Sequence, residues 1–111
     1  MTKLETRAYS SYSRDALKLL AQMIRRARIE RKLTTQELAD RAGISRGLIQ
    51  RIERGDPGCA IGAVFETAAI VGVRLFDADQ PTMAAHLSAN NATLALLPKS
   101  VRPSGKVKDD F

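Results

Sequence analysis

Apolar residues in the first part of the chain recur at spacings of three and four, the pattern of a helix with one buried face. Ser13 can cap such a helix, which the pattern extends to about Lys32, and Leu33 is expected to close the core behind it. The members of the stripe are Leu17, Leu20, Ala21, Ile24 and Ala27.

The next stretch, residues 34–55, predicts two shorter helices joined by a turn. Thr34 can act as an N-cap, and Glu37 three residues later completes a capping box. Gly43 ends the first of these helices, because a positive φ costs least without a β-carbon, and Ser45 can cap the second. The residues expected to face inward are Leu38, Ala39, Ala42, Ile44, Leu48, Ile49 and Ile52.

The pattern after this stretch predicts a loop and a fourth helix. Residues 54–58 form the loop, because Gly and Pro punctuation stops a helix. The stripe of the fourth helix consists of Ile61, Val64, Phe65 and Ala68, and Gly72 stands where its C-terminal cap is expected. The segment that follows either completes the core or forms a short extended segment that pairs with a second subunit; its apolar residues are Val73, Leu75 and Phe76.

A fifth helix is predicted from Pro81, which suits the first turn of a helix. Its aliphatic residues are Met83, Ala84, Leu87, Leu94 and Leu97. The pair Asn90 and Asn91 is a point at which this helix is expected to break. Because the segment carries little charge, it is either a lid over the domain or a dimer contact, and symmetry favours the dimer contact.

Composition limits the chain to one small domain with tails. The 111 residues are 44% hydrophobic, enough for a helical core but not for an enzyme with a separate substrate domain. The net charge is +6, and residues 13–34 hold 7 basic against 2 acidic residues, whereas residues 59–97 hold 1 against 3. The basic run Arg25, Arg26, Arg31 and Lys32 either attracts phosphate or is a solvated helix face.

Catalytic, metal and membrane chemistry have little support in the sequence. Cys59 and His86 each stand alone, and no glycine-rich phosphate loop occurs, so we expect no enzyme, no metal site and no cofactor. The N-terminus has no apolar core of signal-peptide length, and no run approaches the roughly 20 apolar residues of a membrane span. These features predict a cytoplasmic protein.

The segment from Thr34 to Gly55 resembles the helix-turn-helix of the Cro and phage-repressor (XRE) class, in which the second helix enters the major groove of DNA. Its small residue, glycine, apolar turn residue and paired inward aliphatics stand at the offsets of that class. A solvated pair of helices in an all-helical domain is the simpler alternative. The outward residues of the second helix are Arg46, Gly47, Gln50, Arg51 and Arg54, with Ser45 at its tip.

A helix lying in the major groove brings its N-terminal residues nearest to base edges. Ser45 and Arg46 are therefore the candidates for base contacts, since a guanidinium can donate two hydrogen bonds to guanine. Gly47 costs helix stability, which suits a position that DNA approaches closely. Arg51 is expected to reach a base or a phosphate.

Phosphate contacts are expected at the start of the preceding helix, where free N–H groups and the helix dipole favour anions. The candidates are Thr34, Thr35, Gln36 and Arg54, with Gln50 either on phosphate or in solvent. Arg28 and Glu53 are expected to form an internal ion pair, so loss of DNA binding on removal of either would reflect unfolding.

Over Arg25 to Val73 the chain resembles the XRE family, and over almost its whole length it resembles HipB-type antitoxins. The resembling residues are ELADRAGISRGLIQRIERGDPG, then AIGAVFETAAIVGVRLFDAD, and the acidic tail ending in Phe111. Thr35 departs from the family, because many members carry Gln there, so the resemblance carries no base contact to this position.

The resemblance implies a homodimer that binds a palindromic double-stranded operator, represses its own operon and holds a HipA-type serine/threonine kinase inactive. Alternatives are a stand-alone phage-type or metabolic repressor and an interaction adaptor that binds no DNA. The expected organisation is an all-α, five-helix chain: a flexible arm (1–12), a DNA-binding domain (13–76), a helical extension (77–97) and a flexible tail (98–111).

Overall fold

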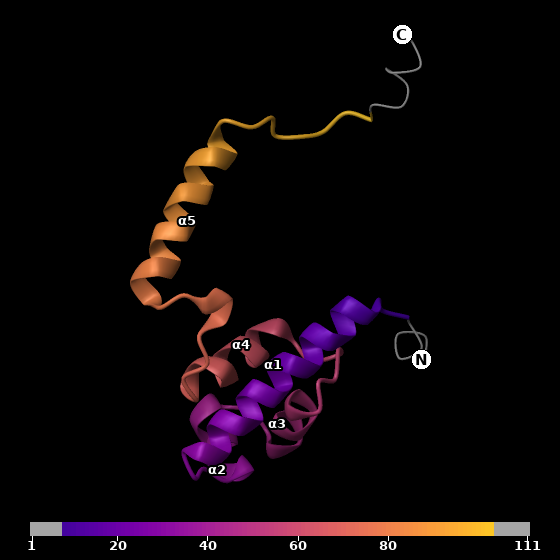
Figure 1. The fold of residues 1–111 in the computed structure, drawn as a ribbon, viewed down its shortest axis with the longest axis vertical. Coiled ribbons are helices and arrows are strands. Elements are labelled where there is room, and N and C mark those ends of the chain that lie inside the picture. Colours follow the sequence, from indigo (N-terminus) through magenta and orange to yellow (C-terminus); the bar gives the residue numbers. More distant parts are fainter. Residues whose placement is uncertain (1–7, 104–111) are drawn as a thin grey trace. The chain divides into compact units, whose positions relative to one another are not determined.

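The structure, a computed structural model, describes residues 8–103 and is all-helical over that part, with five α-helices and no strand (Figure 1). The helices are α1 (Ser11–Glu30), α2 (Thr35–Ala42), α3 (Arg46–Glu53), α4 (Ile61–Ile70) and α5 (Gln80–Ala95), with a 3₁₀ helix, η1 (Leu75–Asp77), before α5. The all-α, five-helix fold class is therefore confirmed. The expectations for residues 1–7 and 104–111, including the acidic end of the tail, lie outside the described residues.

The chain divides into two compact units, Met1–Asp77 and Ala78–Phe111. In the first unit α2 contacts both α3 and α4, α1 contacts α3, and α4 contacts η1. The core of this unit comes from all four α-helices and the residue after α4. Its buried members are Ile24, Leu38, Ala39, Ile49, Ile52, Ala68 and Val71.

Helix α1 begins three residues earlier than predicted. Ser10, rather than Ser13, is the N-cap, because its Oγ accepts a hydrogen bond from the Ser13 backbone N–H at 3.1 Å. The helix ends at Glu30, and Lys32 just beyond it has a left-handed φ of 58°. The expected stripe lies inward, with Ala21 and Ile24 buried.

Helix α4 differs from its predicted stripe at both ends. Ile61 is exposed, and Thr67, a polar residue, is fully buried. The Thr67 hydroxyl donates to the Ala63 carbonyl at 2.8 Å, so its burial leaves no unpaired donor. Gly72 adopts a left-handed φ of 83° directly after the cap residue Val71, as its expected role at this helix end requires.

The segment after α4 is a 3₁₀ turn rather than an extended strand. Val73 and Leu75 pack against the core, whereas Phe76 is 75% exposed. Of the two expectations for this segment, core completion holds for the first two residues only.

Helix α5 runs unbroken through Asn90 and Asn91, so the expected break is wrong. Asp79 caps the helix by accepting from the Thr82 N–H at 2.9 Å, and Pro81 stands in the first turn as predicted. These N-terminal features fix where the helix starts, and the following alanines favour its continuation. None of its residues is buried.

Candidate nucleic-acid interface

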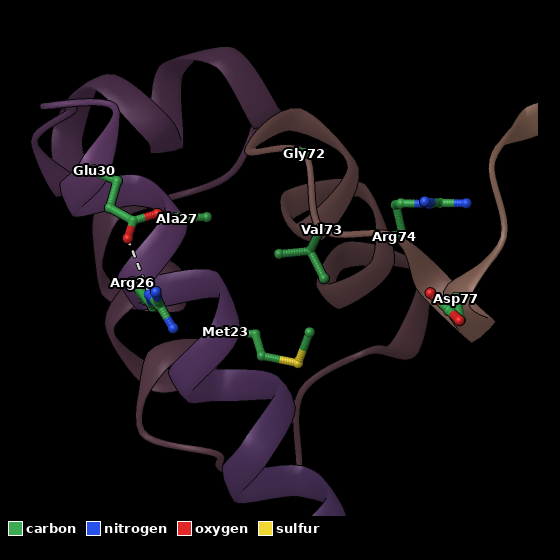
Figure 2. Close-up of a pocket in the computed structure, with 8 residues that line it drawn as sticks. All are labelled: Met23, Arg26, Ala27, Glu30, Gly72, Val73, Arg74 and Asp77. Atoms are coloured by element: carbon green, nitrogen blue, oxygen red, sulfur yellow. Dashed lines mark hydrogen bonds and ion pairs between the residues drawn. The ribbon is translucent and has the colours of Figure 1, made fainter.

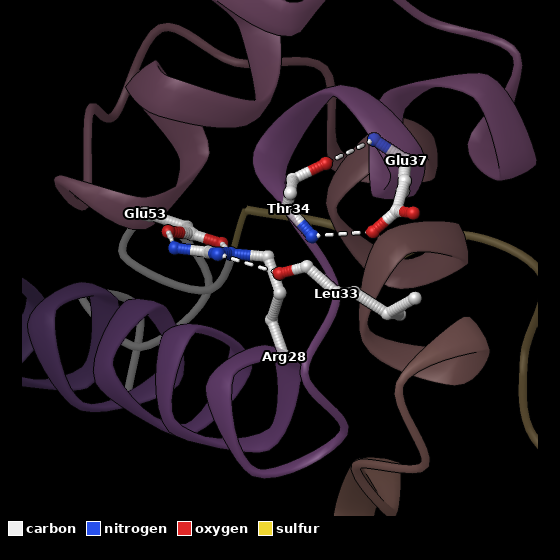
Figure 3. A network of polar contacts seen from close by, with 5 residues as sticks. All are labelled: Arg28, Leu33, Thr34, Glu37 and Glu53. Carbon is white, nitrogen blue, oxygen red and sulfur yellow. Dashed lines mark hydrogen bonds and ion pairs between the residues drawn. The ribbon is translucent and has the colours of Figure 1, made fainter.

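The capped pair α2 and α3 sets the geometry of the candidate interface. Thr34 and Glu37 form the reciprocal capping box at α2: the Glu37 N–H donates to Thr34 Oγ1 at 3.0 Å, and the Thr34 N–H donates to Glu37 Oε1 at 2.8 Å (Figure 3). Gly43 turns the chain with a φ of 71°, and Ser45 Oγ accepts from the Leu48 N–H at 3.0 Å to begin α3. These local bonds fix where both helices start.

Helix α3 has one buried and one exposed face. Ile49 and Ile52 anchor the buried face in the core. The exposed face holds every residue that the sequence assigned to it: Ser45, Arg46, Gly47, Gln50, Arg51 and, just after the helix, Arg54. This face is polar and basic, so its natural partner is an anionic surface.

Arg46 and Gly47 occupy the first turn of α3. Among the described residues, the Arg46 side chain forms no ion pair and no hydrogen bond, which leaves its five N–H donors for a partner. A β-carbon added at Gly47 would meet only Ser45 Oγ, at 3.9 Å. Neither crowding nor a positive φ therefore explains glycine at this position.

Arg51 is held by the loop after its own helix. Its Nε lies 2.8 Å from Asp56 Oδ2, and Asp56 Oδ1 accepts from the Gly58 N–H at 2.8 Å. The hydrogen bond from Arg51, followed by that from Gly58, lowers the pKa of Asp56. The carboxylate thus ties α3 to the following loop and engages one nitrogen of the Arg51 fork, leaving its terminal amino groups for a base or phosphate.

The start of α2 is exposed at Thr34 and Gln36, whereas Thr35 is half-buried. The Gln36 Nε2 donates to Asp40 Oδ1 at 2.9 Å, and the Thr34 hydroxyl is engaged in the capping box. What this end offers an anion is therefore chiefly the backbone N–H groups of the first helical turn.

A second basic site adjoins α3 and involves two residues that the sequence analysis did not single out. Arg14 and Lys18 of α1 line a pocket of about 180 Å³ together with Arg54, Gly55 and Pro57. Gly55 permits this turn through its left-handed φ of 77°, and its backbone passes close to α1, since a β-carbon there would be in ordinary contact with the Leu17 carbonyl oxygen at 3.5 Å. The excess positive charge of residues 13–34 was the available signal, but it did not indicate which cations meet Arg54.

Arg28 and Glu53 join the end of α1 to the end of α3 (Figure 3). Arg28 Nε lies 2.7 Å from Glu53 Oε2 and its Nη2 lies 3.0 Å from Oε1, a two-bond pair whose side chains are only 12% and 7% exposed. Arg28 Nη1 also donates to the Leu33 carbonyl at 2.9 Å. The pair therefore fixes α3 against α1 and the turn before α2.

No group of three or more potential metal ligands occurs among residues 8–103. Burial raises the pKa of the Cys59 thiol, which disfavours the reactive thiolate. In the same part of the chain, no helix has the length and apolar character needed to cross a membrane.

Residues 24–58 match the family model described as Helix-turn-helix. The matched stretch begins within α1 and ends in the loop after α3, so it contains both capped helices and the Arg28–Glu53 pair. No curated protein and no solved structure matches the chain. The family match supports the XRE/Cro type of helix-turn-helix and a DNA-binding transcription regulator, a regulatory domain that is not typically enzymatic.

Proposed function

We propose that this protein is a sequence-specific transcriptional repressor that binds a palindromic operator as a homodimer in the cytoplasm. The observation that carries the proposal is Arg46, which stands exposed and unpaired within the described residues in the first turn of α3. A guanidinium there can donate two hydrogen bonds to guanine O6 and N7, a contact worth about 1–3 kcal/mol of discrimination. Ser45, Gly47 and Arg51 complete the proposed base-contacting group.

Phosphate contacts are proposed on both sides of this group. Thr34, Thr35 and Gln36 supply the start of α2, and Gln50 and Arg54 extend the contact along α3. Arg14 and Lys18 add charge to the pocket beside Arg54. Each phosphate neutralised should contribute about −0.9 to the slope of log affinity against log salt, so the double variant Arg14→Ala/Lys18→Ala should flatten that slope.

We further propose that the protein is the antitoxin of a HipA-type kinase pair and represses the operon that encodes both. Support for this finer role comes from the resemblance of the chain beyond the helix-turn-helix, and from a helix, α5, that has no fully buried residue within the described chain. A stand-alone repressor is the alternative. Co-expression with a kinase encoded beside the gene separates the two: co-purification supports the antitoxin, and two separate proteins would leave the stand-alone repressor.

The deciding experiment for DNA recognition is a mobility shift with the DNA upstream of the gene, at moderate salt and with excess competitor. Arg46→Ala is expected to remove preference for the operator while the helical content stays unchanged. Arg25→Ala is the matched control, because it removes an equal charge from an exposed position of α1. It should weaken binding to all sequences alike.

Two results would contradict the proposed recognition. Equal behaviour of the Arg46→Ala and Arg25→Ala variants would exclude base recognition by Arg46. The absence of any retained fragment would favour the interaction adaptor that binds no DNA.

A further inference from the structure

A groove in the first unit lies between α1 and the segment after α4, and it is apolar over one part of its length. One part, of about 240 Å³, is lined mainly by Leu20, Met23, Phe65, Val73, Leu75 and Phe76. A second part, of about 350 Å³, shares Met23, Val73 and Arg74 with the first and is more polar, because Arg26, Glu30 and Asp77 also line it. Figure 2 shows Met23 and Ala27 of α1 facing Val73 across this second part.

The rim of the groove keeps large apolar side chains in solvent. Phe76 is 75% exposed and stands edge-on to Phe65, with ring centroids 6.1 Å apart and an interplanar angle of 82°. Leu19, one helical turn before Met23 on α1, is 58% exposed. Contiguous exposed apolar surface of this kind marks an interaction site.

Helix α5 is a second apolar surface without a partner inside its own unit. It contains no Asp, Glu, Lys or Arg in 16 residues and has no fully buried residue; Met83 is half-buried, whereas Leu87 and Leu94 are 58% and 64% exposed. Met83, Leu87 and Leu94 follow one another at spacings of four and seven, which places them on one face together with Asn90. Most helical stability in proteins comes from packing of an apolar face, so we expect the aliphatic face of α5 to be covered.

We propose that α5 of one copy of this chain lies in the α1 groove of a second copy, and that the second copy returns the same contact. The inference rests on the homodimer of the proposed function and is independent of DNA recognition. A reciprocal exchange of this kind has the two-fold symmetry of most homodimers and covers both apolar surfaces in both copies.

The lengths and areas of the two surfaces agree. Leu19 and Glu30 are as far apart along α1 as Met83 and Leu94 are along α5, about 17 Å at 1.5 Å per residue. A 16-residue helix is about 24 Å long and 10 Å wide, so each contact covers on the order of 240 Å² of each partner. Two contacts bury about 1,000 Å², the size at which specific association begins.

The charge of the first unit and the connection between the two units also favour α5 of a second copy as the occupant of the groove. Residues 1–77 hold 14 basic against 9 acidic residues, so another copy of the basic unit would be repelled from the groove, whereas an uncharged helix brings no charge to its apolar part. Phe76 and Asp77, directly before the second unit, have left-handed φ values of 54° and 52°. Short, strained connections of this kind favour the exchange of an element between copies.

Sedimentation equilibrium of the full chain over a range of concentrations tests the proposal without DNA. The wild type should be a dimer, and Leu87→Asp on α5 or Met23→Asp in the groove should each raise the dissociation constant at least tenfold. Leu96→Asp, beyond the end of α5, and Gln22→Glu, beside the groove residue on α1, are exposed controls that should remain dimeric. An equimolar mixture of the two disrupted variants should associate more tightly than either variant alone but more weakly than the wild type, because one of the two contacts is intact.

Cross-linking distinguishes exchange from the other arrangements. In a Cys59→Ser background, Met23→Cys mixed with Leu87→Cys should give a disulfide-linked dimer. The chain that carries both substitutions is oxidised at high dilution as the second arm. A disulfide that forms within one monomer, with no covalent dimer, would show that α5 covers its own groove and would overturn the proposal. A wild type that stays monomeric, or a dimer disrupted by Leu87→Asp but not by Met23→Asp, would also overturn it. If the protein proves not to bind DNA, the monomer and dimer masses expected in these experiments stay the same, so the two proposals fail separately.

Discussion

Helices α3 and α5 differ in the way that each is stabilised. Helix α3 has 8 residues, and its Ile49 and Ile52 are buried in the core of the first unit. Helix α5 has 16 residues and buries none of them. The shorter helix depends on tertiary packing, whereas the longer one has only its cap, its Pro81 and its alanine-rich composition within the described chain.

The exposed faces of the two helices differ as well. The outer face of α3 carries the side chains of Arg46, Arg51 and Arg54. It also carries Gly47, and no contact within the described residues requires a glycine there. The stripe of α5 is aliphatic and the whole helix lacks charge. The first surface fits a polyanion and the second fits another apolar surface, so one small chain presents two chemically different interfaces.

Disrupting the Arg28–Glu53 pair, which holds α3 against α1, should have the largest effect on stability. Glu53→Gln removes the charge that compensates Arg28 at a largely buried site, and we expect the free energy of unfolding to fall by about 3–5 kcal/mol. Urea denaturation followed by circular dichroism measures this loss.

The control for the buried pair is the exposed pair Arg26–Glu30, whose side chains are 81% and 61% exposed. Glu30→Gln should cost no more than about 0.5 kcal/mol. Equal losses in the two variants would mean that the Arg28–Glu53 pair contributes no more than a surface ion pair.

Because the core of the first unit is buried and α5 has no buried residue, truncating a leucine should destabilise the protein much more in the core than on α5. This difference in stability is expected to be somewhat smaller than the first. Leu38→Ala opens a cavity in the core, because Leu38 is fully buried, and should cost about 2–5 kcal/mol. Leu87→Ala on α5 should change stability by less than about 0.5 kcal/mol when the protein is dilute enough to be monomeric. Thermal unfolding at low micromolar concentration compares them, and a large loss for Leu87→Ala would show that α5 is packed within a single chain.

The parts of the fold that the sequence predicted are those determined by a few neighbouring residues. The capping box of Thr34 and Glu37, the left-handed Gly43 and the cap at Ser45 each depend on bonds that span four residues or fewer. The same local rules predicted Ser13 as the cap of α1, and there the prediction was wrong. The structure selects Ser10, and Ser13 supplies its donor.

The features that the sequence did not predict depend on contacts across the fold or on bonds within a turn. Hydropathy indicated Ile61 as a core residue, but the first residue of α4 is exposed, while Thr67 is buried with its hydroxyl bonded to the helix. Arg14 and Lys18 meet Arg54 only because the loop after α3 packs on α1. No pattern within a single segment carries that information.

Substitution of Gly47 should change stability and DNA binding in opposite directions. Gly47→Ala should raise the free energy of unfolding by about 0.5–1 kcal/mol, because alanine loses less backbone entropy in a helix and the site has room for a β-carbon. If DNA approaches closely there, affinity for the operator should fall by about tenfold, or about 1.4 kcal/mol. Gly62→Ala is matched, since Gly62 is also the second residue of a helix and has open space around it. Gly62→Ala should stabilise the fold equally without changing the affinity for DNA. Unchanged DNA affinity in both variants would mean that Gly47 does not lie in the interface.

The smallest expected effect concerns the loop that holds Arg51. Because the folded protein lowers the pKa of Asp56, this carboxylate stabilises the fold above the ordinary aspartate pKa of about 3.9, and the contribution is lost as the pH falls through the lower folded value. A carbon-13 NMR titration should therefore place the Asp56 midpoint below 3.9. Arg51→Ala should raise that midpoint towards the ordinary value, with part of the shift retained through the Gly58 N–H, whereas Arg46→Ala should leave it unchanged. An Asp56 midpoint that is insensitive to Arg51→Ala would mean that the loop does not restrain this arginine in solution, so its whole fork would be free to contact DNA.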